Sequence, residues 1–80
     1  MTFTKQRYVA MEFIVTMVRC LRKGLLEPNE PLIMEACKQI EAYYQDGYID
    51  KELFRDITDM LYDDFGVIYP FTFDKKVSQN

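Results

Sequence analysis

Apolar residues recur at three- and four-residue spacing through most of this chain, a pattern typical of amphipathic α-helices. Glycine and proline residues divide the pattern into separate segments. We expect helices over about 4–23, 31–45 and 50–64, with Gly24 ending the first and Gly66 following the third. The sequence therefore predicts an all-α protein, a three-helix bundle.

The ends of the expected helices carry residues that favour those positions. Thr4 can cap the first helix and Asp50 the third, because their side-chain oxygens can accept hydrogen bonds from the first turn. The apolar segment 67–73 contains Pro70, which prevents a helix there. We expect this extended aromatic C-terminal segment to close the bundle and the polar end, 74–80, to be frayed.

The first helix differs from the other two in the width of its apolar face. At about 100° per residue, five polar side chains share an arc of about 60°: Lys5, Glu12, Thr16, Arg19 and Lys23. Apolar side chains spread over roughly 240° of the remainder, whereas a globular helix needs an apolar stripe only a little over 100° wide. The second and third helices are short, so we expect that they cover only part of this apolar surface and that something else covers the rest.

Two explanations account for the apolar surplus of the first helix. In one, this helix is the central element, and segment 67–73 lies across its open side. In the other, part of the helix binds a protein, and a second copy of the chain is the commonest such partner. The candidate residues for this apolar protein-binding face are Met11, Val15, Val18, Leu25, Leu26, Phe71 and Phe73.

The third helix carries an acidic ridge, which we define as Glu52, Asp56, Asp59 and Asp63. These carboxylates fall within about 60° of one another and extend over about 16 Å, nearly opposite the apolar stripe. The ridge is either a solvated helix face or a binding site for a basic partner. Duplex DNA has roughly nine phosphates over that length, so the ridge would be a sparse mimic of DNA.

Composition narrows the function classes. A chain of 80 residues makes one helical domain. Its residues are 49% hydrophobic and its net charge is only −3, so its composition is too apolar for a disordered chain. Because 13 acidic residues outnumber 10 basic ones, direct nucleic-acid binding is not expected. No apolar run approaches the 18 or so residues of a membrane span. Two cysteines without a C-x-x-C pair or a signal peptide indicate a reduced, cytoplasmic setting.

The residue types that carry most enzyme chemistry are missing or isolated. The chain has no histidine, and Cys20 and Cys37 lie on apolar helix faces, where a thiol usually serves packing. Asp59 and Asp63 would offer a metal ion only two carboxylates, so we expect neither a metal nor a cofactor. We expect a small non-catalytic regulatory or adaptor protein that binds another protein and can form a homodimer. The alternative is an acidic inhibitor or immunity-type protein that blocks the basic site of a nuclease or nucleic-acid-binding enzyme.

Overall fold

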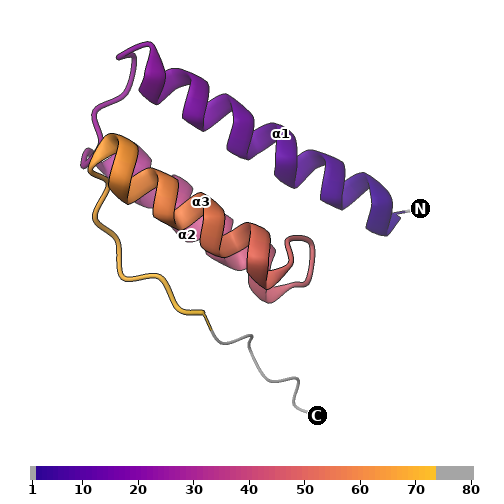
Figure 1. The fold of residues 1–80 in the computed structure, drawn as a ribbon. Coiled ribbons are helices and arrows are strands. Elements are labelled where there is room, and N and C mark those ends of the chain that lie inside the picture. Colours follow the sequence, from indigo (N-terminus) through magenta and orange to yellow (C-terminus); the bar gives the residue numbers. More distant parts are fainter. Residues whose placement is uncertain (1, 74–80) are drawn as a thin grey trace.

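The computed structural model describes residues 2–73, and three α-helices make up most of this part of the chain. Helix α1 spans Thr2–Arg22, α2 spans Pro31–Gln45 and α3 spans Lys51–Phe65. Helices α1 and α3 run in the same direction and α2 runs in the opposite one (Figure 1). The prediction of an all-α protein with three helices is confirmed; the end expected to be frayed, 74–80, lies outside the described residues.

The predicted helix boundaries are correct to within two residues, and one predicted cap is wrong. Helix α1 begins at Thr2, so Thr4 lies inside it, because no glycine or proline interrupts the helix before that residue. Asp50 does cap α3: the Leu53 amide donates a hydrogen bond of 2.8 Å to its Oδ1 atom. Gly66 ends α3 with a φ of 74°, a left-handed conformation that favours glycine.

The core takes only a narrow stripe from α1. Four buried residues of that helix, spaced three or four apart, fall within an arc of about 60°: Ala10, Ile14, Met17 and Leu21. The rest of the core is built by α2, α3 and the segments that follow them: Ile33, Cys37, Ile40, Tyr44, Ile49, Phe54, Ile57, Leu61 and Val67. Helix α2 packs against both other helices, whereas α1 and α3 approach each other less closely. Helix α2, and not α1, is therefore the central element.

The extended segment 67–73, which we call the aromatic tail, lies along α2 and α3 on the side away from α1 (Figure 1). The Tyr44 and Phe54 rings stack with centroids 4.3 Å apart, and Phe71 and Phe73 approach Phe54 at 5.5 and 5.2 Å. The Tyr44 hydroxyl donates a hydrogen bond to the Phe73 carbonyl oxygen. The explanation in which this segment covers the first helix is therefore wrong, because α2 and α3 offer the tail an aromatic surface of their own.

Candidate functional site

The apolar surplus of α1 remains as two flanks, one on each side of its core stripe. On the flank that faces α3, Val15 is 43% exposed, and Met11 and Val18 are half-buried against the core. On the flank that faces α2, Phe13 and Cys20 are half-buried. Each flank borders an open groove between α1 and a neighbouring helix.

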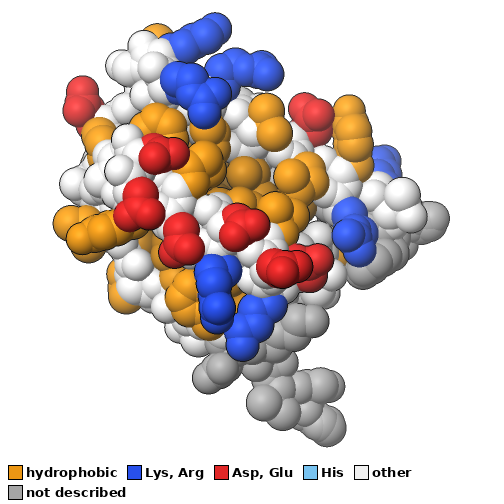
Figure 2. All heavy atoms as spheres, viewed as in Figure 1, with side chains coloured by type: hydrophobic (Ala, Val, Ile, Leu, Met, Phe, Trp, Pro, Cys, Tyr) orange, Lys and Arg blue, Asp and Glu red, His pale blue; other side chains and the backbone are white. Residues whose placement is uncertain are grey.

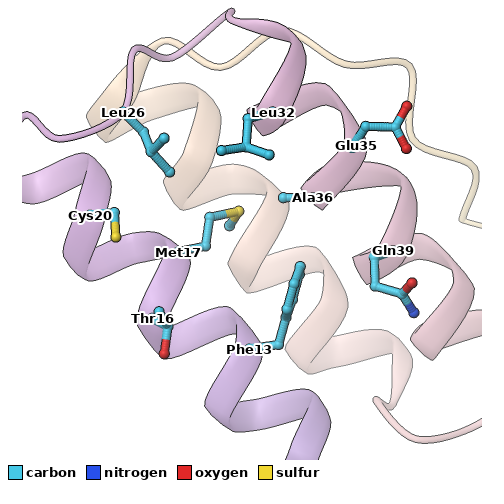
Figure 3. A pocket seen from close by; sticks show the side chains of 9 residues that line it. All are labelled: Phe13, Thr16, Met17, Cys20, Leu26, Leu32, Glu35, Ala36 and Gln39. Carbon is cyan, nitrogen blue, oxygen red and sulfur yellow. The ribbon is translucent and has the colours of Figure 1, made fainter.

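The larger of these hollows, which we call the α1–α2 groove, has a volume of about 430 Å³. Three apolar side chains converge in this groove: Met17 of α1, Leu26 of the linker between α1 and α2, and Leu32 of α2 (Figure 3). Phe13 closes its other end. Glu35 and Gln39 of α2 extend away from these apolar side chains, toward the rim (Figure 3). The complete lining is Phe13, Thr16, Met17, Cys20, Leu26, Leu32, Glu35, Ala36 and Gln39. The groove thus has an apolar floor and polar edges.

The second hollow, which we call the α1–α3 groove, has a volume of about 290 Å³. Its lining is Ile14, Val15, Val18, Arg19, Arg22 and Met60. In Figure 2, apolar side chains gather between α1 and α3, a row of carboxylates runs over α3, and a basic group lies at the end of α1. An apolar strip is therefore bordered by acidic side chains along one helix and by basic side chains at the end of the other.

The acidic ridge lies on the outer surface of α3, and all four of its residues are exposed. Met60, which lines the α1–α3 groove, stands one residue after Asp59 and four after Asp56, so the ridge borders that groove. Arg55, on the same helix, is held toward the aromatic tail, with its guanidinium carbon 5.5 Å from the centroid of the Phe73 ring. The basic residues of α3, Lys51 and Arg55, line a shallow hollow with Glu52 and Asp56 at the start of the ridge.

The structure brings together some of the predicted apolar residues and separates others. Val15 and Leu25 are exposed, Leu25 by 69%. Leu26 is half-buried in the α1–α2 groove. Phe71 and Phe73 belong to the aromatic tail on the far side of α2 and α3, so they do not share a surface with α1.

Sequence reasoning missed several residues of the two grooves. Leu32 is 59% exposed and lines the α1–α2 groove with Thr16 and Ala36, but none of these was a candidate. Leu32 lies outside the buried stripe of α2, and a large apolar residue displaced from its helix stripe is a signal of a second contact surface. Met60, which is half-exposed in the α1–α3 groove, was not a candidate either.

The two cysteines differ in their environments. Burial raises the pKa of the Cys37 thiol to about 11, so this side chain is a neutral thiol at physiological pH and packs as an apolar group. Cys20 is half-exposed at the α1–α2 groove, and neither cysteine is in a disulfide. Within residues 2–73, no three side chains of the types that bind metals are arranged to hold an ion.

Within the same range, no helix combines the length and apolar character needed to cross a bilayer. The chain matches no protein-family model, no curated protein and no solved structure.

Proposed function

We propose that this chain is a small non-catalytic regulatory or adaptor protein that binds another protein along the uncovered flanks of α1. The observation that carries this proposal is the position of the aromatic tail: it packs on Tyr44 and Phe54, away from α1, so the apolar side chains beside the core stripe of α1 stay accessible. Accessible apolar surface in a small protein is typical of a binding site.

The α1–α2 groove is the part of this surface best suited to a partner protein. Its floor joins side chains from α1, the linker and α2, and Leu25 and Leu32 extend the apolar area beyond it with 69% and 59% of their surfaces exposed. Glu35 and Gln39 supply polar groups at the edge (Figure 3). An apolar centre with a polar rim is the usual composition of a protein–protein interface.

A photoreactive amino acid at position 16 tests this function in the cells that make the protein. Thr16 is exposed and lines the α1–α2 groove, so irradiation should produce one dominant covalent adduct with another protein. Tyr62 is the matched control, because it is a helical residue with 63% exposure that lies on α3 beside the tail. The same photoreactive group at position 62 should give no adduct with that protein.

A second variant shows whether the adduct depends on the groove. Ala36→Arg places a long side chain in the groove while its charge can reach water, so it should remove the position-16 adduct and leave the helical content unchanged. Equal adducts from positions 16 and 62, or an adduct that persists in the Ala36→Arg protein, would reject this groove as the binding site.

The alternative function, an acidic inhibitor of a nuclease or nucleic-acid-binding enzyme, is supported by the exposure of the whole acidic ridge along α3. The same experiment separates the two proposals. If the inhibitor function holds, a photoreactive residue at Asp56 should capture a nucleic-acid enzyme, and position 16 should not. Added DNA should then compete with the Asp56 adduct, because DNA and the ridge would occupy the same basic site.

A further inference from the structure

We infer that a second copy of this chain occupies the α1–α3 groove, with α1 of each copy lying over α3 of the other. The inference rests on the proposed function, because it takes the uncovered flanks of α1 to be protein-binding surfaces and names the occupant of one of them. The α1–α2 groove stays open in this dimer and is available to a different protein.

The apolar floor of the α1–α3 groove is suited to pairing with itself. Val15, Val18 and Met60 form a strip along the gap between the two helices, and all three keep part of their surface in solvent. Two such strips laid face to face would remove the same apolar side chains of both copies from water, as a twofold interface requires.

The charges at the edges of the groove determine which twofold axis fits. Arg19 and Arg22 line the groove near the end of α1, and Asp59 and Asp63 lie near the end of α3. Because α1 and α3 run in the same direction, both groups lie at the same end of the bundle (Figure 1). An axis along the groove lays each α1 over the partner's α3 and keeps those ends together. Each pair of arginines then faces a pair of aspartates in the other copy.

The other twofold axis in this plane, directed across the groove, gives an unfavourable arrangement. It would lay α1 on α1 in opposite directions, so that Arg19 would approach Lys5 of the other copy. It would also lay α3 on α3 and bring Asp63 near Glu52. Like charges brought together in this way oppose association, and the axis along the groove is therefore the one selected.

The α1–α2 groove does not have this self-complementary pattern. Glu35 is the only charged side chain in its lining, so a second copy placed there would find no basic group opposite its carboxylate within the groove. The lining of the α1–α3 groove instead carries Arg19 and Arg22, and carboxylates run along its α3 edge (Figure 2). This difference assigns the second copy to the α1–α3 groove.

The available area is sufficient for a weak, reversible dimer. Helix α3, the shorter of the two, has 15 residues and is about 22 Å long at 1.5 Å per residue, and two helices packed about 10 Å apart present a face about 20 Å wide. This face gives roughly 450 Å² per copy, or about 900 Å² in total, which is in the range of weak, transient interfaces. We therefore expect a dissociation constant in the micromolar range or above.

Sedimentation equilibrium of two complementary charge reversals tests this dimer. The basic-edge variant carries Arg19→Glu and Arg22→Glu, and the acidic-edge variant carries Asp59→Lys and Asp63→Lys. The unmodified chain should show a reversible monomer–dimer equilibrium. Each variant alone should dimerise at least about tenfold more weakly, because like charges face one another twice in its homodimer. An equimolar mixture should regain dimers, because both interfaces of the mixed pair again join opposite charges.

The mixture is the decisive measurement, since a charge interaction within one chain could not be restored by adding a second variant. Circular dichroism and thermal unfolding of each variant verify its fold. Glu27→Lys with Glu35→Lys makes the same change in net charge as the acidic-edge variant but lies outside the α1–α3 groove, and this control should dimerise as the unmodified chain does.

The results also separate this inference from the proposed function. An unmodified chain that stays monomeric up to submillimolar concentration, or a dimer indifferent to both reversals, would overturn the inference. If the chain is monomeric and the position-16 adduct still forms, the dimer is rejected and the proposal that another protein binds in the α1–α2 groove is supported. A dimer restored by mixing, without that adduct, would support the second copy and reject the other protein.

Discussion

Phe54→Ala should lower the free energy of unfolding by about 3–5 kcal/mol, the usual cost of removing a fully buried phenylalanine ring. Phe54 is 0% exposed, stacks on Tyr44 and receives both Phe71 and Phe73. Its loss would therefore leave a cavity and disconnect the tail from α3. Because a chain of 80 residues is stable by only about 4–12 kcal/mol, this substitution should remove a large part of the total stability.

Urea unfolding followed by circular dichroism measures this effect, and Tyr62→Ala is the control. Tyr62 is an aromatic residue of the same helix with 63% exposure, so its removal should change the free energy of unfolding by no more than about 0.5 kcal/mol. Similar losses in the two variants would contradict the described arrangement of α3, in which Phe54 is buried in the core and Tyr62 faces solvent.

Replacing both Phe71 and Phe73 by alanine should cost about 3–4 kcal/mol. Each ring is half-buried against the core, so each removal should cost about half as much as removal of a fully buried ring. The tail stabilises α2 and α3 in this way even though it has no regular secondary structure. Thermal unfolding should show a large decrease in the midpoint temperature, on the order of 4–8 °C for each kcal/mol.

Ile68→Ala is the matched change within the tail, because Ile68 is 67% exposed. It should alter the unfolding free energy by less than about 0.5 kcal/mol. A double phenylalanine variant that unfolds like the unmodified chain would show that the tail is not anchored on Phe54.

The helices could be predicted because their signals are local. Gly24 and Gly66 follow the first and third helices, and the bounds of α2, 31–45, are those expected. Thr4 was placed wrongly because a capping residue type indicates a possible start but does not prevent an upstream turn from becoming helical. The position of the aromatic tail could not be predicted from local sequence signals. Periodicity shows that a surface is apolar, but it does not show which other surface packs against it.

In the candidate site, too, residues that are set by helix periodicity could be predicted, whereas residues that depend on tertiary packing could not. Val15 and Val18 were found from their angle on the helix, because an apolar side chain that lies outside both the core stripe and the polar arc of this helix must lie on a flank. Leu32 and Ala36 were missed because the α1–α2 groove exists only after the linker brings two helices together. Phe71 was assigned to the same face as α1 because the side on which the chain leaves Gly66 is a tertiary feature.

The most direct test of the account is the stability of Val15→Lys beside that of Ile14→Lys, measured on protein dilute enough to be monomeric. Ile14 and Val15 are neighbours in sequence, but Ile14 is 4% exposed and Val15 is 43% exposed. In the monomer, therefore, only the Val15 side chain should be accessible to solvent. Lysine at position 15 should change the unfolding free energy by no more than about 0.5 kcal/mol, whereas at position 14 it should cost several kcal/mol by burying a charge. A loss of about 2 kcal/mol or more at position 15 would mean that another part of the same chain covers this flank of α1, and it would contradict the account.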